Sequence, residues 1–317
     1  MIRLLCPSPK SFSVRARLEA NRALQAHFIA MDQDRFDRVA PDYDAVMVRF
    51  NTRVGANVMG EKSRLKAILS PTTGLDHIDL AVARRRGVRV FHLRDQGGLL
   101  RRINPTAELT IALMLALLRR LPAAMESVKA GRWQAADFLG REAADKTIGI
   151  VGYGRLGRKV ARTARALDMK VIACDTRDVT MPRLVERCVN LDNLLQRADV
   201  VSIHVPLNDS TCGLIGRKEI ARMKPGAVLI NTARGAIVDD TALLAALRTG
   251  HLGGAAVDVL DGEHRLESGG HPMIDYARKH GNLLITPHVG GATEESIEKT
   301  DMNVLERYLQ WAGITGR

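Results

Sequence analysis

Three polar side chains stand just after apolar, strand-like segments in the second half of the chain: Arg234, Glu263 and His288. A guanidinium binds a carboxylate through two charge-assisted hydrogen bonds, and an imidazole exchanges a proton near neutral pH. A glutamate that hydrogen-bonds the imidazole favours its protonated form. Taken singly, such residues are more often surface ion pairs, solvated carboxylates or turn caps. At consecutive strand ends they predict a site that binds a small 2-hydroxy acid and moves its hydroxyl proton.

A glycine-rich turn upstream predicts the second component of that chemistry. The apolar run Thr147–Val151 leads into a G-x-G-x-x-G turn at Gly152, Gly154 and Gly157. The first glycine allows the tight turn, the second lets the backbone approach a pyrophosphate, and the third lets the next helix pack on the strand. The N-terminus of that helix would offer N–H donors to the phosphates. The turn therefore predicts a dinucleotide site, and the alternative is a structural turn without a ligand.

An acidic residue then ends the next apolar segment. Asp175 lies 18 residues after Gly157 (175 − 157), close to the spacing of the acid that grips the adenosine ribose. A carboxylate there accepts hydrogen bonds from ribose hydroxyls and repels a 2′-phosphate, which favours NAD over NADP. Arg177, two residues further on, is the one reason to expect that NADP is tolerated.

The elements that must position these residues alternate between strand and helix, which predicts parallel sheets with helices on both faces. The fold class predicted is α/β, with two doubly wound parallel-sheet domains. In the first part we expect strands at 2–6, 44–50, 65–70 and 88–91, and helices at 14–28, 54–61 and 78–85. In the second we expect strands at 147–151, 170–175, 200–205, 227–231, 255–259 and 283–286, and a closing helix at 294–311.

Two segments between these parts have distinct compositions. Residues 94–104 break the alternation and are expected to form a basic crossing loop. Asn104 and Pro105 then resemble an N-cap and a first helical position. The helix that follows, to residue 121, is apolar nearly all round, which predicts burial inside the domain or in a subunit contact. We favour a homodimer through the 105–121 helix region.

Composition excludes several classes of protein. The chain has 317 residues, a formal net charge of +12 and four scattered cysteines. No apolar run reaches the ~18 residues that a membrane span needs, and the first residues do not form a secretory signal. Cysteines without a C-x-x-C pair fit a reducing cytoplasm and predict no metal site. The basic charge forms no long tract with interleaved aromatics, so nucleic-acid binding is unlikely and a basic solvated surface is favoured.

Several longer motifs make the chain similar to the D-isomer-specific 2-hydroxyacid dehydrogenases, the family that includes phosphoglycerate, glyoxylate and D-lactate dehydrogenases. They are Thr-Gly-Leu-Asp-His-Ile-Asp at 73–79, the glycine turn at 149–157, Ser-Ile-His-Val-Pro-Leu at 202–207 with Thr211, the Lys-Pro-Gly to Arg-Gly run at 224–235, and Thr-Pro-His-Val-Gly-Gly at 286–291. The resemblance covers nearly the whole chain.

The resemblance implies an enzyme that transfers a hydride between NAD(H) and C2 of a small D-2-hydroxy acid or 2-keto acid. Arg234, Glu263 and His288 match the family's catalytic set. Substrate contacts are implied at Arg49, Thr73 and Gly74. Cofactor contacts are implied at Gly152, Gly154, Arg155, Leu156, Gly157, Asp175, His204, Pro206, Thr211, Thr232, Ala233, Asp258 and Gly290, with Asp258 near the nicotinamide carboxamide.

The same resemblance implies a discontinuous architecture. A flavodoxin-like substrate domain would comprise 1–97 and 288–317, with a Rossmann NAD-binding domain at 98–287 inserted into it and a cleft that closes by hinge motion. Three departures are evident: the 90–108 crossover is long, His264 replaces the usual proline, and no regulatory domain is expected after the last helix. The particular 2-hydroxy acid stays open. The alternative is a non-catalytic, corepressor-like NAD-binding protein on the same scaffold.

Overall fold

The computed structural model describes residues 1–263 and 270–314 and divides into two compact units. Unit 1 comprises Met1–Ile103 and Gly291–Arg317, and unit 2 comprises Asn104–Gly290. The chain therefore passes between units after residues 103 and 290, where the sequence placed the crossings after residues 97 and 287. The first crossing comes later because residues 97–103 are part of unit 1, where Leu100 is buried in the core.

Unit 1 is built on a parallel sheet with the strand order β2-β1-β3-β4-β5, the order of flavodoxin-like folds. Its strands are β1 (Arg3–Cys6), β2 (Gln25–Phe28), β3 (Ala45–Met47), β4 (Ala67–Leu69) and β5 (Arg89–Phe91). Successive residues of β1 serve opposite faces: Leu4 belongs to one hydrophobic cluster and Leu5 to the other. Both faces of the sheet are thus buried.

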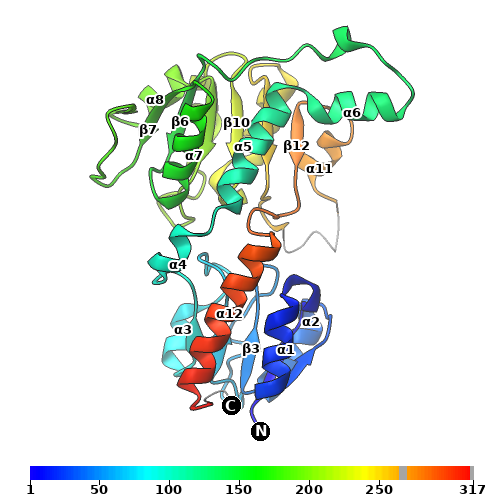
Figure 1. The fold of residues 1–317 in the computed structure, drawn as a ribbon, viewed down its shortest axis with the longest axis vertical. Helices are drawn as coiled ribbons and strands as arrows, with labels where there is room; N and C mark the ends of the chain where they lie inside the picture. The colour runs from blue at the N-terminus through cyan, green and yellow to red at the C-terminus, as the bar shows by residue number, and fades with distance from the viewer. Residues whose placement is uncertain (264–269, 315–317) are drawn as a thin grey trace. The chain divides into compact units, whose positions relative to one another are not determined.

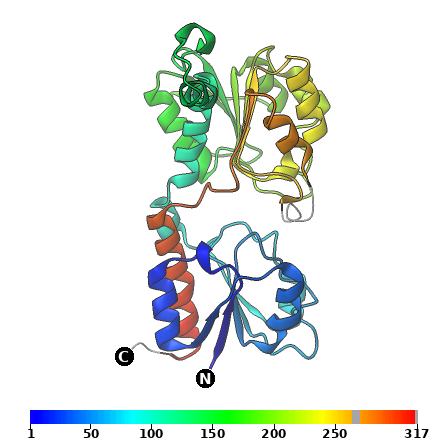
Figure 2. The same ribbon diagram turned by 90° about the vertical axis from the view of Figure 1, so that its right-hand side faces the viewer.

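Helices cover the two faces of this sheet. They are α1 (Val14–Ala23), α2 (Gln33–Val39), α3 (Leu80–Arg85), α4 (Gly97–Arg101) and α12 (Glu294–Trp311), with 3-10 turns at Pro9–Ser11 and Ala40–Asp42. In Figure 2, α1 (blue) and α12 (red) lie on the same side of the strands. Ser13 caps α1 and Thr293 caps α12 through their side-chain oxygens, as N-cap residues do.

Three local predictions in unit 1 were wrong. The helix expected at 14–28 ends at Ala23, and the next residues form edge strand β2 beside β1. Residues 54–61 form turns instead of a helix, because Val54 makes a bridge to Ile78. The expected crossing loop contains α4, and α2 was not predicted. In the first two cases pairing with a distant segment decided the structure of residues whose own sequence was ambiguous.

Unit 2 is built on a parallel sheet with the order β12-β11-β10-β9-β6-β7-β8, which is the Rossmann order with an added edge strand. The strands are β6 (Thr147–Val151), β7 (Lys170–Cys174), β8 (Val185–Arg187), β9 (Val200–Ile203), β10 (Val228–Asn231), β11 (Gly254–Val257) and β12 (Leu283–Ile285). The missed strand, β8, is a three-residue edge with two exposed residues.

The helices of unit 2 form two layers around the sheet (Figure 2). They are α5 (Pro105–Leu118), α6 (Leu121–Lys129), α7 (Arg155–Ala166), α8 (Leu191–Arg197), α9 (Arg217–Arg222), α10 (Asp240–Arg248) and α11 (Pro272–Ala277), with 3-10 turns at Ala135–Phe138 and Gly235–Ile237. Buried residues of α5 and α7 share one cluster, and those of α8 to α11 share the other. The predicted fold class is confirmed in both units.

The apolar helix α5 is buried within its own unit. It lies beside α7 and against β10, β11 and β12 (Figure 1). Met114 is 1% exposed, and Leu117 lies where a side chain on Gly254 of β11 would have to go. The all-round apolar character of this helix is therefore explained by packing inside unit 2.

Candidate active site

The ends of β10, β11 and β12 bring the predicted catalytic loops together. These strands are neighbours in register, and in a parallel sheet their carboxyl ends share one edge. Gly235 fixes the approach of two loops, because a Cβ there would lie 2.0 Å from the carbonyl carbon of Leu260 and 2.2 Å from the nitrogen of Asp261. The loop that carries Arg234 therefore packs directly on the loop that leads to Glu263.

Glu263 and His288 form a close polar pair at this edge. Oε1 of Glu263 lies 2.6 Å from Nδ1 of His288, the length of a charge-assisted hydrogen bond. Their side chains are 27% and 15% exposed, so the pair is partly screened from water and still accessible. With Nδ1 bonded to the carboxylate, proton exchange with a substrate would use Nε2.

The backbone around His288 is held in an unusual shape. His288 has φ of 54°, in the left-handed region that non-glycine residues rarely adopt. Asp258, 1% exposed, holds this turn in place: its carboxylate accepts from the Thr286 hydroxyl at 2.5 Å and from the N–H groups of Val289 and Gly290 at 2.8 and 2.7 Å. Backbone strain at such a residue persists when the surrounding hydrogen bonds determine its conformation.

Arg234 is presented by a turn that Asn231 organises. The Asn231 amide donates to the carbonyl of Arg234 at 2.9 Å and accepts from the N–H of Ala233 at 3.0 Å. The guanidinium donates from Nη1 to the Ala233 carbonyl at 2.7 Å. The buried amide at the end of β10 thus sets the direction in which the arginine leaves the sheet.

The glycine turn has the geometry that its sequence predicts. Gly152 has φ of 94°, and a Cβ there would lie 2.8 Å from the carbonyl oxygen of His204. A Cβ on Gly157 would lie 2.2 Å from the carbonyl oxygen of Gly152, so only glycine lets α7 start this close to β6. Gly154 is the N-cap of α7. The residues present therefore fit a dinucleotide pyrophosphate at the helix N-terminus.

Asp175, which directly follows β7, is hydrogen-bonded to two neighbouring residues. It accepts from the N–H of Tyr153 at 2.9 Å, and Arg177 donates to both its oxygens from Nε and Nη2 at 3.0 and 2.9 Å. Hydrogen bonds from Arg177 hold the pKa of the Asp175 carboxyl at about 2. The Asp175 side chain is 5% exposed and that of Arg177 is 67% exposed, so the arginine lies over the carboxylate on its solvent side.

The segment after β9 is tied to the sheet by local hydrogen bonds. Ser202 Oγ lies 2.8 Å from Nε2 of His204, and burial lowers the pKa of the His204 imidazole to about 4. The Thr211 hydroxyl donates to the carbonyl of Pro206 at 2.6 Å. His204, Pro206 and Thr211 therefore lie at the carboxyl end of β9, beside the glycine turn, as a cofactor-binding segment would.

The lowered pKa of His204 predicts an acid-sensitive contribution to stability. Because the folded state resists protonating His204 until about pH 4, the unfolded chain binds that proton first as the pH falls below 6.5. Stability is therefore lost between pH 6.5 and 4, by up to about 3 kcal/mol. Urea unfolding at pH 7.5 and pH 5 should show a smaller loss for His204→Gln than for wild type. Equal losses in the two proteins would contradict the burial of a neutral imidazole.

Two threonines of helix α5 form hydrogen bonds with residues of the loops after β10 and β12. The hydroxyls of Thr110 and Thr232 lie 2.8 Å apart, and Thr106 donates to the carbonyl of Gly290 at 2.8 Å. Thr232 and Gly290, both predicted cofactor contacts, are thus braced by one helix. Arg155 and Leu156 are the first residues of α7 and lie between Gly154 and Gly157 of the glycine turn, and both are partly exposed.

In unit 1, the carbonyl groups of the loop that carries Thr73 and Gly74 accept hydrogen bonds from other protein groups. The carbonyl of Thr72 accepts from Leu93 N–H at 3.1 Å, that of Thr73 from Arg94 Nε at 2.8 Å, and that of Gly74 from the Thr72 hydroxyl at 2.7 Å. The following N–H of a trans peptide points the opposite way from its carbonyl. Within residues 1–263 and 270–314, the N–H groups of Thr73, Gly74 and Leu75 have no partner, so they form a candidate anion-binding nest.

The Arg49 side chain is largely buried and forms an ion pair within unit 1. Its Nη2 donates to Asp301 of α12 at 2.6 Å and its Nε to the carbonyl of Ser11 at 2.9 Å. Burial lowers the pKa of Arg49. The pair links β3 to the C-terminal helix and so joins the two chain segments of unit 1. The predicted substrate contact of Arg49 stays a prediction.

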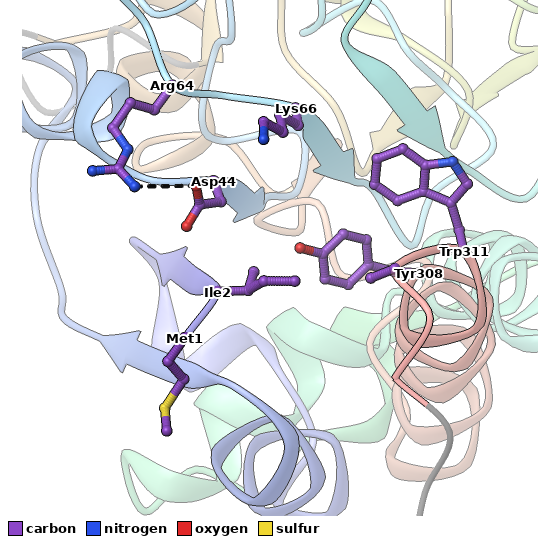
Figure 3. Close-up of a pocket in the computed structure, with 8 residues that line it drawn as sticks. Met1, Ile2, Asp44, Arg64, Lys66, Tyr308 and Trp311 are labelled. Atoms are coloured by element: carbon purple, nitrogen blue, oxygen red, sulfur yellow. Dashed lines mark ion pairs between the residues drawn. The ribbon is translucent and has the colours of Figure 1, made fainter.

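A hollow of ≈ 380 Å³ in unit 1 lies away from these residues. Met1, Asp44 and Lys66, which precede the first residues of β1, β3 and β4, line it together with Tyr308 and Trp311 of α12 (Figure 3). Asp44 is paired with Arg64 at 3.6 Å. The hollow is therefore at the amino ends of the strands, whereas ligands of open parallel sheets bind at the carboxyl ends.

In 1–263 and 270–314, no cluster of histidine, cysteine or acidic side chains has the grouping of a metal site. Among the helices in those ranges, none has both the length and the apolarity to cross a bilayer.

Three residues that hold these loops in place were not assigned that role from the sequence. Asn231, which orients Arg234, and Thr286, which bonds Asp258, sit inside motifs that the sequence singled out, but their roles depend on side-chain direction. Arg94, which bonds Thr73, stands in a segment expected to be a loop. The signal for Arg94 was the cluster of basic residues between 94 and 102.

Comparisons with known proteins place this chain in one class, the dehydrogenases with a Rossmann NAD-binding domain. A family model described as "D-isomer specific 2-hydroxyacid dehydrogenase, NAD binding domain" matches residues 111–290. The chain belongs to the D-isomer-specific 2-hydroxyacid dehydrogenase family, and the predictions of the family and of NAD as cofactor are confirmed.

Named relatives fall within this family. A hydroxypyruvate reductase of Thermotoga maritima is 34% identical over 288 residues, 90% of each chain. A D-3-phosphoglycerate dehydrogenase of Archaeoglobus fulgidus is 37% identical over 285 residues, 89% of this chain and 52% of that protein. A solved D-lactate dehydrogenase of Aquifex aeolicus with NAD and lactic acid has a TM-score of 0.84 at 29% identity, covering 98% of this chain and 96% of that one. The chain spans about half the length of the phosphoglycerate dehydrogenases that it matches.

Proposed function

We propose that the protein is an NAD-dependent D-2-hydroxyacid dehydrogenase that interconverts a small D-2-hydroxy acid and its 2-keto acid. The observation that carries this proposal is the Glu263–His288 pair, 2.6 Å apart, at the strand edge that also presents Arg234. The same unit contains the glycine turn that fits a dinucleotide. A protein that only senses NAD has no need of a paired acid and base at that edge.

The roles of the catalytic set follow from its chemistry. Bound NAD(H) supplies or accepts the hydride at C2 of the acid. His288 takes the proton of the substrate hydroxyl during oxidation and returns it during reduction. Glu263 fixes the ring through Nδ1 and stabilises the imidazolium that forms. Arg234 binds the substrate and stabilises negative charge on its C2 oxygen.

The substrate carboxylate has a second set of candidate donors. We propose that the N–H groups of Thr73 and Gly74 receive it, because the carbonyl groups on either side of them are held away by Leu93, Arg94 and Thr72. Backbone N–H groups fixed in this way cost no reorganisation when an anion binds.

Asp175 supports a preference for NAD over NADP. Its carboxylate is held ionised and would face a 2′-phosphate with like charge. The Arg177 guanidinium is bonded to that carboxylate, so less of its positive charge is available to attract a 2′-phosphate. We therefore propose NAD as the preferred cofactor and weak use of NADP.

We also propose a reducing, cytoplasmic setting for the protein, with which its four free thiols agree.

The test is a screen of 2-keto acids with NADH and, in parallel, with NADPH, following loss of the reduced cofactor. We expect turnover of at least one short 2-keto acid, a D-configured product and a preference for NADH. Tight NADH binding without turnover of any 2-keto acid would support the corepressor-like alternative.

We also propose that a second copy of the chain covers the segment 121–139. The strongly exposed apolar residues of this segment are Met125 at 59%, Val128 at 51%, Trp133 at 86% and Leu139 at 80%. The segment returns to its own start, where the N–H of Arg141 donates to the carbonyl of Leu118 at 2.9 Å. Exposed apolar residues gathered in this way mark an interface, and most soluble homo-oligomers are self-complementary dimers.

Oligomeric state tests this interface. Trp133→Ser with Leu139→Ser should shift the protein from dimer to monomer in sedimentation velocity, because it removes the two most exposed apolar side chains of the segment. Val189→Ser is the matched control, since Val189 is 86% exposed elsewhere in unit 2. A monomeric wild type, or a double variant that stays dimeric, would show that this segment is not the interface.

A further inference from the structure

The His271 side chain bonds the backbone just ahead of Glu263. Its Nε2 lies 3.2 Å from the carbonyl oxygen of Asp261, a residue that stands 10 positions earlier in the sequence. Glu263 follows Asp261 almost directly along the chain. The acid of the proposed catalytic pair therefore extends from a stretch of backbone that His271 anchors.

The surroundings of the His271 ring place its hydrogen on Nε2. Nδ1 accepts a hydrogen bond from the N–H of Met273 at 3.2 Å, as part of the N-cap of α11. Nε2 faces two acceptors, the carbonyl of Asp261 and, at 3.5 Å, the carboxylate of Asp240 in α10. In a neutral imidazole the nitrogen that accepts carries no hydrogen, so the other nitrogen carries it. The ring therefore donates from Nε2 to the Asp261 carbonyl.

The neighbouring peptide group is held from another direction. A Cβ on Gly235 would lie 2.2 Å from the nitrogen of Asp261, so the peptide group before Asp261 packs on the loop that carries Arg234. His271 holds the next peptide group through its carbonyl oxygen. Two successive peptide groups ahead of Glu263 are thus fixed, one by close packing and one by a side-chain hydrogen bond.

The Glu263 carboxylate depends on this stretch of backbone for its direction. Its Oε2 accepts from the N–H of Leu260 at 3.3 Å, and its Oε1 lies 2.6 Å from Nδ1 of His288. The side chain is only partly buried. Its orientation toward His288 is therefore determined by these bonds and by the backbone at 260–263 that carries it.

We propose that His271 is a positioning residue for catalysis, which sets Glu263 for its contact with His288 by holding the carbonyl of Asp261. The inference rests on the proposed function and extends the support of its catalytic pair to α11. Because His271 acts through Glu263, loss of its Nε2 donor should lower kcat and leave NADH binding unchanged. A residue that only caps α11 would contribute to stability alone.

Asparagine and glutamine separate the two hydrogen bonds of the His271 ring. The polar end group of asparagine is as many bonds from Cα as Nδ1 of histidine, and that of glutamine is as many bonds from Cα as Nε2. His271→Asn can therefore keep the bond from Met273, and asparagine is a favourable N-cap residue, but it loses the donor to Asp261. His271→Gln can keep that donor and loses the cap.

The two variants should differ in opposite ways from wild type. We expect kcat of His271→Asn to fall about 10-fold, between the worth of one hydrogen bond and the cost of a misplaced catalytic group. Its urea midpoint and its affinity for NADH should stay close to those of wild type. His271→Gln should keep kcat within about twofold of wild type and have a lower urea midpoint.

A second background tests whether the effect passes through Glu263. In Glu263→Gln the carboxylate is gone and its position no longer matters, so adding His271→Asn should change kcat by less than about twofold. His251→Asn is the matched control, because Nε2 of His251 also bonds a backbone carbonyl of unit 2, that of Ile220 at 2.9 Å. Its kcat should equal that of wild type.

Two results would overturn the positioning role and leave the dehydrogenase proposal intact. Wild-type kcat in His271→Asn, with any loss confined to the less stable His271→Gln, would reduce His271 to a helix cap. An equal loss of kcat with and without the Glu263 carboxylate would show that His271 does not act through Glu263. Absence of wild-type turnover with every 2-keto acid would instead count against the proposed function itself.

Discussion

His288→Gln should lower kcat by ~10²–10⁴ at saturating NADH, because general acid-base catalysis by a positioned side chain contributes that much. Glutamine preserves much of the volume and a hydrogen-bonding end group, but it cannot take up or release a proton at neutral pH. The change should appear in steady-state reduction of whichever 2-keto acid the wild type uses best.

Cofactor binding is the internal control for this variant. His288 belongs to the β12 loop, whereas the glycine turn follows β6, so NADH should bind with nearly unchanged affinity in a fluorescence titration. Reduced turnover together with lost NADH binding would indicate a damaged fold. Turnover equal to wild type would remove the general-base role from His288.

Gly235→Ala should abolish most activity and destabilise the protein by about 3 kcal/mol, the upper part of the range for overpacking a buried site. The added methyl group would lie 2.0 Å from the backbone carbon of Leu260, and backbone cannot move aside as a flexible side chain does. The loops of β10 and β11 must separate, which moves Arg234 away from Glu263.

Chemical denaturation and kcat measure both effects. Gly55→Ala is the matched control, since a Cβ there meets no atom within 4 Å. It should leave stability nearly unchanged and activity intact. A Gly235→Ala protein with wild-type turnover would show that close packing of these loops is not what positions the catalytic set.

The parts of the fold that the sequence predicted are those with strong local signals. Gly152 and Gly157 were assigned their roles from spacing alone, and their contacts confirm the steric reason for each. β10, which precedes Arg234, is buried along its whole length, and β12, which precedes His288, is apolar at all three of its residues, so the ends of both strands were easy to place. Residues at such ends must share an edge once the sheet is parallel.

What the sequence could not provide depends on contacts between distant segments. Arg49 bonds Asp301 across 252 residues of chain, and no local pattern predicts that pairing. Arg94 bonds Thr73 from a segment expected to be a plain crossing loop. The edge strands β2 and β8 were missed because each is short and gains its structure from a neighbour. Local sequence patterns predict the strands and helices, whereas side-chain direction and the pairing of distant segments depend on packing.

The claim that Glu263 and His288 act as one unit is tested most directly by a double-mutant cycle on kcat. We expect Glu263→Gln alone to lower kcat roughly 10- to 100-fold, because the imidazole loses its orienting carboxylate. In the His288→Gln background the same change should alter kcat by no more than about twofold, within ordinary additivity error. Losses that simply multiply in the double variant would show that the two side chains act independently and would contradict the proposed catalytic pair.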